Sequence, residues 1–263
     1  EVKGYQEYQA PSASQHNLRP RWQTKVITMN PNGVRFQAFR DNNIAAKAEI
    51  FQGLQGSEIA HSMCIEQGLI TQELSQSGLL HDGTLGCAMS HRALWQEAAA
   101  SNEGMLVLED DVIMHTKLTE WIDDNHETLI SCDITHFTIN TDSVLATTTP
   151  EGLQQSNVFN PKNPEPQWIK QSLQNTNIAS IRLHKLLKAF GMCCYFISPQ
   201  GARRLIEHTF PLTLKTSPIP LVTNAMPGIS IDRRLNAFYP QLKAAITVPF
   251  LAYTPNNDSS TQG

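Results

Sequence analysis

The sequence predicts an α/β fold in a single domain, with a mostly parallel central sheet flanked by helices. Strand-like apolar segments alternate with helix-like segments, an order that favours parallel strands covered by helices. The chain has 263 residues, 40% of them hydrophobic, which suffices for a large core without disulfide or metal crosslinks. Three adjacent acids also follow one apolar segment, and ligands bind at the carboxyl ends of strands in such sheets.

Each element in the first half has its own local signal. The β-branched residues of 24–29 run into Asn-Pro-Asn-Gly, which is typical of a strand followed by a turn. In an Ala-rich stretch, Leu85/Met89 and Leu94/Ala98 are pairs spaced four residues apart, and Asn and Gly follow it as stop signals. We therefore expect strands at 24–29, 48–51 and 105–108 and helices at 34–43, 57–69 and 84–101.

The second half continues the alternation less regularly. Ser198 and Pro199 have the residue types of a helix N-cap and a first turn. Residues 147–176 are rich in Thr, Pro, Asn and Gln, which predicts a long loop that closes over the site. A second irregular segment covers 211–227. The expected elements are strands at 133–139, 192–197 and 244–248 and helices at 117–129, 199–208 and 231–239.

We expect the folded domain to span residues 23–253. Residues 1–22 form a polar N-terminal extension without the cationic start and apolar stretch of a secretory signal, and residues 254–263 are expected to be a disordered tail. The chain does not begin with Met, so a missing targeting segment stays open. No apolar stretch approaches the ~18–20 residues that span a bilayer, so no transmembrane segment is expected.

Charge and cysteine content exclude some classes of protein. The chain has 20 Lys and Arg against 24 Asp and Glu, a net charge of −4, and no cationic run, so nucleic acid is not an expected partner. The five cysteines are an odd number, contain no C-x-x-C, and include a neighbouring pair that is hard to bridge. These features favour reduced thiols in the cytosol, with peripheral contact at the inner face of a membrane left open.

The three acids are Glu109, Asp110 and Asp111. Adjacent carboxylates repel one another unless a cation or water shares the site. In an extended backbone Glu109 and Asp111 project to the same side, so these two can share one hard divalent ion while leaving positions on it for phosphate oxygens. The alternative is an acidic strand end that is solvated or that caps the next helix.

Two segments carry a longer pattern around these acids. Residues 83–95 read GTLGCAMSHRALW and residues 106–112 read LVLEDDV. Further along, residues 191–198 read GMCCYFIS, with Gly-Ala at 201–202, and residues 229–235 read ISIDRRL. Together, over roughly residues 24–250, these segments resemble glycosyltransferase family 25, which includes lipooligosaccharide glycosyltransferases and procollagen galactosyltransferases.

The resemblance implies a GT-A type fold, a UDP-sugar donor, a saccharide or glycoconjugate acceptor, and usually inversion. It also implies a divalent metal, Mn²⁺ in preference to Mg²⁺, held by Glu109 and Asp111. A cation there would offset the charge that builds on the leaving diphosphate. The residues assigned to the nucleotide sugar are Asn30, Arg35, Ser90, His91 and Asp110.

Asp232 is the candidate general base for the acceptor hydroxyl. It is the one acid in the downstream motif and begins a helix, where the carboxylate form is favoured. The alternative role is an N-terminal cap for that helix.

His91 has several competing interpretations. With Ser90 it contacts the donor or positions the acidic strand, or it is a core histidine. It also lies one helical turn after Cys87, the spacing of a zinc pair, but the sequence offers no accompanying ligand cluster. Trp95 and Tyr195 are expected to be packing residues.

The sequence therefore predicts a metal-dependent glycosyltransferase that moves a hexose, galactose or glucose, from a UDP-sugar to a hydroxyl of a saccharide or glycoconjugate. A catalytically silent sugar-binding relative is the main alternative, although every acid is present. A metal-dependent phosphoesterase would need more His and Asp ligands than the triplet supplies.

Overall fold

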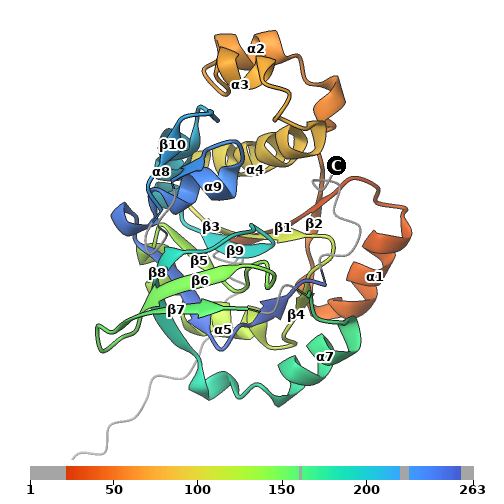
Figure 1. The fold of residues 1–263 in the computed structure, drawn as a ribbon. Helices are drawn as coiled ribbons and strands as arrows, with labels where there is room; N and C mark the ends of the chain where they lie inside the picture. The colour runs from red at the N-terminus through yellow and green to blue at the C-terminus, as the bar shows by residue number, and fades with distance from the viewer. Residues whose placement is uncertain (1–21, 160–161, 220–224, 256–263) are drawn as a thin grey trace, which may run out of the picture.

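The computed structural model describes residues 22–159, 162–219 and 225–255. It contains a nine-stranded sheet with helices on both faces (Figure 1). The strands are β1 (Trp22–Thr28), β2 (Glu49–Gln52), β3 (Gly104–Glu109), β4 (Ile113–Met114), β5 (Ile134–His136), β6 (Val144–Thr148), β7 (Gln154–Val158), β8 (Arg182–Lys188), β9 (Cys194–Ile197), β10 (Thr216–Ser217), β11 (Met226–Pro227), β12 (Ala244–Val248) and β13 (Ala252–Tyr253). The α-helices are α1 (Val34–Asn42), α2 (His61–Glu66), α3 (Gln72–Gln76), α4 (Asp82–Ala100), α5 (Leu118–Asp124), α6 (His126–Ser131), α7 (Pro166–Asn175), α8 (Pro199–Thr209) and α9 (Ile231–Asn236). Short 3-10 helices are η1 (Ile44–Ala46), η2 (Gly56–Glu58), η3 (Ile178–Ser180) and η4 (Tyr239–Gln241).

The central sheet is mixed, which corrects the expectation of a mostly parallel sheet. Its order is β2-β1-β3-β9-β5-β12-β8-β6-β7. Among the described strands, β1–β2, β1–β3 and β5–β12 pair in parallel, and the other five neighbouring pairs are antiparallel. β9 causes part of the difference because it inserts between β3 and β5 and runs against both. The strands β1, β3, β5 and β12 still share one direction, so their carboxyl ends lie at one edge.

The sheet separates two layers of apolar side chains. Along β3, Met105 and Val107 pack with α4, α8 and α9, whereas Leu106 and Leu108 pack with α1, α5 and α6. This is the alternation of a strand buried on both faces. In Figure 1, α2, α3 and α4 lie on one side of the sheet, and α5 lies on the other. Strand β3 is therefore held rigidly up to its carboxyl end.

Helix α4 lies very close to the segment that follows β2. A Cβ atom on Gly86 would be 2.4 Å from the carbonyl oxygen of Leu54, so only glycine allows this approach. One turn later, the Ser90 hydroxyl donates to the Gly86 carbonyl at 2.7 Å and accepts the Leu54 N–H at 2.8 Å. The spacing of glycine and serine in the 83–95 motif thus fixes α4 against this loop.

Most expected elements in the described residues are confirmed, with ends shifted by a few residues. The helix expected at 84–101 is α4, and the strand expected at 105–108 is β3. Ser198 caps α8 as expected, because its hydroxyl accepts the Gly201 N–H at 3.0 Å. The helices expected at 57–69 and 117–129 are each divided into shorter helices.

The prediction of a long loop at 147–176 is wrong. This segment contains the end of β6, all of β7 and the ten-residue helix α7. Edge strand β7 exposes four of its five residues, so it has no apolar alternation for a sequence pattern to reveal. Helix α7 buries only Ile169 and Leu173, four residues apart. Strand β8 was also not expected.

The domain limits are partly outside the described residues. Trp22 is the first residue of β1, not the last of an extension, and residues 1–21 lie outside the description. At the other end Thr254 is fully buried, while residues 256–263 of the expected tail lie outside the description. Among the described helices, none has the length and apolar character needed to cross a bilayer.

Candidate active site

The acidic triplet lies at the carboxyl edge of the sheet, at the end of β3. Glu109 is the last residue of β3, and Asp110 and Asp111 form the turn after it. The Glu109 N–H donates to the carbonyl of Cys193, just before antiparallel β9, at 2.8 Å. The beginning of β9 therefore lies beside the end of β3. The triplet is thus at the edge where α/β sheets bind ligands.

Arg35 from α1 neutralises two of the three acids. Its Nε atom lies 2.6 Å from Asp110 Oδ1, and its Nη2 atom lies 3.2 Å from Asp111 Oδ2. Asp110 also accepts a hydrogen bond from the Thr28 hydroxyl at 2.5 Å. Burial lowers the pKa of Arg35. The charges of Asp111, Asp110 and Glu109 raise it by more than burial lowers it, so the pKa of Arg35 lies above its ordinary value. Asp110 is thus tied into the fold, whereas Asp111 keeps one oxygen unused.

That unused oxygen is Asp111 Oδ1. It is buried and has no hydrogen-bond partner among the described residues. Burial first, and then the nearby charge of Glu109, raise the pKa of Asp111 to about 6, although Arg35 and the Thr254 hydroxyl act in the opposite direction. A buried carboxylate beside a second carboxylate is a place where a cation would be stabilising.

Glu109 is held by a line of buried hydrogen bonds. Trp95 Nε1–H can only donate, and it donates to the Tyr195 hydroxyl at 2.8 Å. Tyr195 then donates to His91 Nδ1 at 2.9 Å, which leaves the proton of His91 on Nε2, facing Glu109 Oε1 at 3.3 Å. His91 and Tyr195 are only 1% and 0% exposed. These four residues, here called the Trp95–Glu109 relay, fix the orientation of the Glu109 carboxylate.

Cys87 brings a second set of ligand atoms to Glu109. Ligand atoms of Cys87, His91 and Glu109 all lie within 4.8 Å of one another. The pair Cys87 and His91 thus has a third partner that sequence spacing could not supply, because Glu109 comes from a different element. Burial and the charges of Glu109 and Asp232 raise the pKa of Cys87 well above its ordinary value. Without a metal this thiol therefore stays protonated and neutral.

Asp232 lies near the same edge, in the first turn of α9. Its carboxylate accepts the hydroxyl of Ser230 and the N–H of Arg233, the latter at 2.8 Å. Its other oxygen accepts the Gly191 N–H at 3.3 Å. Its charge acts on Cys87, as does that of Glu109, so the two acids flank this thiol. The N-cap of α9 is Ser230, so the predicted capping role of Asp232 is wrong. Asp232 instead accepts hydrogen bonds in the first turn of α9, and its role as general base stays a prediction.

A family model now adds to this geometry. Residues 34–219 match glycosyltransferase family 25, described as an LPS biosynthesis protein. The chain belongs to glycosyltransferase family 25. A search of curated proteins finds no match to it. Membership of glycosyltransferase family 25 makes the chain a glycosyltransferase, with a nucleotide-sugar donor and a saccharide acceptor.

The matched stretch contains most, but not all, of the candidate site. Arg35, the Trp95–Glu109 relay and all three acids lie within it, whereas Asp232 and Thr254 lie beyond its end. The place of Asp232 in the site therefore rests on geometry rather than on this family 25 match.

Ser90 and Asn30 differ in what they can offer a donor. The Ser90 side chain is 1% exposed and bonded on both sides, so it has a structural role in place of the donor contact expected from the sequence. Asn30 is exposed in the turn after β1, where its side chain accepts the Asn32 N–H at 3.1 Å. Its contact with the donor stays a prediction.

Sequence reasoning missed three participants. Tyr195 was expected to be a packing residue, and its motif gave no sign of the histidine that it contacts. Thr28 and Thr254 carry no local signal, because each reaches an acid far away in the chain. Only the fold brings these residues to the triplet.

Replacing Tyr195 with Phe should break the Trp95–Glu109 relay. The change leaves the indole N–H of Trp95 and Nδ1 of His91 buried without a partner, so unfolding free energy should fall by about 1–3 kcal/mol. Tyr239→Phe is a matched control, because Tyr239 is also buried but its hydroxyl bonds only His136 among the described residues. Urea denaturation should give the larger loss for Tyr195→Phe. Equal losses would contradict the relay.

The raised pKa of Asp111 predicts a pH dependence of stability. Because the folded-state pKa of about 6 lies above the unfolded value of ~3.9, the folded state binds the proton more tightly. In the presence of a chelator, this group's contribution should therefore increase as pH falls from ~6 to ~4 and be lost as pH rises. Asp111→Asn should remove that part of the slope in urea titrations, and the exposed control Asp124→Asn should not. If the unfolding free energy of the parent and of Asp111→Asn changed equally with pH, the predicted contribution of Asp111 would be ruled out.

Proposed function

We propose that this enzyme transfers a hexose, galactose or glucose, from a UDP-sugar to a hydroxyl of a saccharide or glycoconjugate, with inversion and with the help of a divalent cation. The observation that carries the proposal is the carboxylate pair of Glu109 and Asp111, with a buried, unbonded oxygen on Asp111. We place the reaction in the cytoplasm or at the inner face of a membrane, and in lipopolysaccharide assembly, in keeping with the description of the family.

Glu109 and Asp111 would hold the cation, and their chemistry fits Mn²⁺ or Mg²⁺. Both offer carboxylate oxygens, which hard divalent ions prefer. Asp111 Oδ1 has no competing hydrogen bond among the described residues, and the 27% exposure of the Glu109 side chain gives access from solvent. When bound, the cation would stabilise the negative charge that develops on the leaving UDP.

The set of Cys87, His91 and Glu109 suits the cation less well. Both nitrogens of His91 already face protein partners, and the pKa of the Cys87 thiol is raised. A thiolate is also a softer ligand than Mn²⁺ favours. We therefore assign His91 to positioning Glu109.

Arg35 is proposed to contact the donor diphosphate. Its side chain is 38% exposed even though it touches Asp110 and Asp111. The planar fork of N–H donors in a guanidinium matches phosphate oxygens. Asp110 holds Arg35 in place, which gives Asp110 an indirect part in donor binding.

Asp232 is proposed to be the general base. A sugar hydroxyl is a weak nucleophile at neutral pH, so a positioned carboxylate that takes its proton promotes attack on the anomeric carbon. Hydrogen bonds from the N–H groups of Gly191 and Arg233 fix the orientation of this carboxylate.

The two alternatives are less well supported. A silent sugar-binding relative needs none of the acids, yet all three and Asp232 are present beside Arg35 and the relay. A phosphoesterase would need a larger ligand set, and in the described residues one group of three candidate ligands is found. Hydrolysis of the donor without transfer would favour the phosphoesterase.

Replacing Asp111 with Asn should weaken Mn²⁺-dependent UDP binding about tenfold or more, because an anionic ligand is lost with little change in volume. Cys87→Ala is the control for the alternative ligand set and should bind as the parent does. Calorimetric titration with UDP, with and without Mn²⁺, measures both. The cation site would be reassigned to Cys87, His91 and Glu109 if Asp111→Asn bound UDP as tightly as the parent, or if Cys87→Ala alone lost UDP binding.

Replacing Asp232 with Asn should lower turnover by ~10²–10⁴-fold while donor affinity stays near parental. Asn keeps the Oδ1 atom that accepts the Ser230 hydroxyl and the Arg233 N–H, so the melting temperature should change little. Turnover, UDP-sugar affinity and melting temperature of this one variant separate catalysis from a purely structural role in α9. Near-parental turnover would eliminate Asp232 as the base, and Asp142 after β5 would be tested next.

A further inference from the structure

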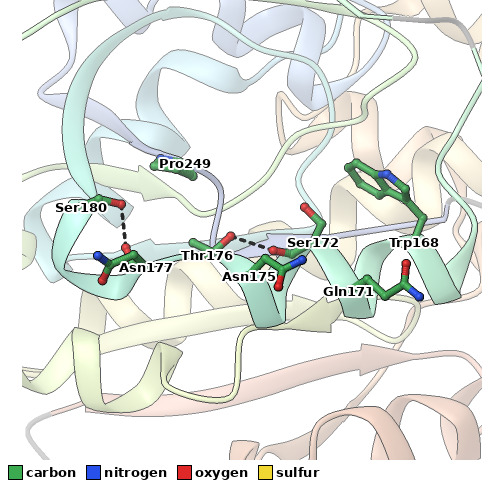
Figure 2. A pocket seen from close by; sticks show the side chains of 8 residues that line it. All are labelled: Trp168, Gln171, Ser172, Asn175, Thr176, Asn177, Ser180 and Pro249. Carbon is green, nitrogen blue, oxygen red and sulfur yellow. Dashed lines mark hydrogen bonds between the residues drawn. The ribbon is translucent and has the colours of Figure 1, made fainter.

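A hollow of about 520 Å³ lies beside α7, away from the residues assigned above (Figure 2). Its wall is formed by Trp168, Gln171 and Asn175 of α7, by Asn177 after the helix, and by Pro249 after β12. None of its lining residues is charged. Its volume is in the range of small-ligand sites. The ligand expected in such a hollow is therefore neutral and polar.

Trp168 gives the hollow an aromatic wall. Its side chain is 51% exposed, whereas the other three tryptophans of the chain are at most 9% exposed. The indole is backed by Tyr253, with ring centroids 5.5 Å apart at an interplanar angle of 83°. Tyr253 is in turn packed against Phe250. Trp168 is therefore a supported ring with a large exposed surface.

Amide groups supply the polar part of the wall. The side-chain amides of Gln171 and Asn175 are exposed and make no hydrogen bond within the described ranges. In Figure 2, they lie along the same helix as Trp168. An amide both donates and accepts, as each sugar hydroxyl does, and the C–H face of a pyranose packs on the electron-rich face of an indole. This combination matches a saccharide better than a charged or wholly apolar ligand.

The hollow is connected to the acidic edge through β13. Tyr253, which supports Trp168, pairs with Ile113 of β4, two residues after Asp111. The next residue, Thr254, acts on the Asp111 carboxyl through its hydroxyl. A saccharide in the hollow would therefore lie along the short ribbon that leads to the acids.

We propose that the α7 hollow is a saccharide-binding subsite, built around Trp168, for the part of the acceptor that extends away from the reacting hydroxyl. The inference rests on the proposed function, because it assigns the hollow to the acceptor of the same transfer. Gln171 and Asn175 bond the sugar hydroxyls, and the indole of Trp168 packs on a pyranose face.

The test uses the full chain and three neutral oligosaccharides as probes: lactose, maltotriose and chitotriose. Because Trp168 is the exposed indole, its fluorescence should change on titration with at least one probe, measured up to the solubility limit. Trp168→Ala should abolish the signal, so binding by that variant is measured by calorimetry and should weaken about tenfold. Gln171→Ala should weaken binding in both measurements.

Gln174→Ala is the matched control, since Gln174 lies on the same helix but lines a different hollow of about 240 Å³. It should bind the probes as the parent does. UDP binding in the presence of Mn²⁺ should be unchanged in all three variants.

Two results would overturn the subsite. One is the absence of a fluorescence or calorimetric response to every probe, and the other is equal binding by Trp168→Ala and the parent. If UDP and Mn²⁺ still bind, the proposed function survives the loss of the subsite. Failure of UDP to bind the parent would instead overturn the proposed function.

Discussion

The constraint on which this site depends is the placement of three consecutive carboxylates at the end of a buried strand. Such a cluster is unfavourable unless each charge has its own partner. The structure divides them among separate elements: Arg35 of α1 contacts Asp110 and Asp111, and His91 of α4 contacts Glu109. Of the three acids, Asp111 alone keeps a buried oxygen for which the described residues provide no hydrogen bond. Asp111 Oδ1 therefore lacks a partner among the described residues, and a bound cation would supply one.

The same constraint explains the spacing of the long motif on α4. Gly86 and Ser90 hold the helix against the loop after β2, and His91 and Trp95, one turn apart, face the opposite direction toward Tyr195. Only a helix anchored on one face can present a buried imidazole to Glu109 at a fixed distance. The residues of the 83–95 motif thus mainly position the Glu109 carboxylate, and they need not touch the donor.

Sequence analysis located the acids and the helix before them because both signals are local: an apolar run that ends in charge, and a repeat of apolar residues every four positions. It could not find the partners of those residues, since Arg35, Thr28 and Tyr195 are each at least 70 residues from the acid or histidine that they contact. The mixed sheet was missed for a related reason. Strand direction depends on long-range pairing, and β9 has the same apolar composition in either direction.

The limits of the family match divide the site in a physically sensible way. The matched residues 34–219 contain the framework: Arg35, the relay, the acids and α7. The groups proposed above to serve the acceptor, Asp232 and the Tyr253 ring behind Trp168, come from the segment after residue 219. On the proposed function, a framework that binds a cation and a diphosphate would serve any nucleotide sugar, whereas contacts outside that framework would select the acceptor. If the α7 hollow binds the acceptor as proposed, the choice of acceptor depends on how β13 packs against β4 and α7, because Tyr253 of β13 supports Trp168.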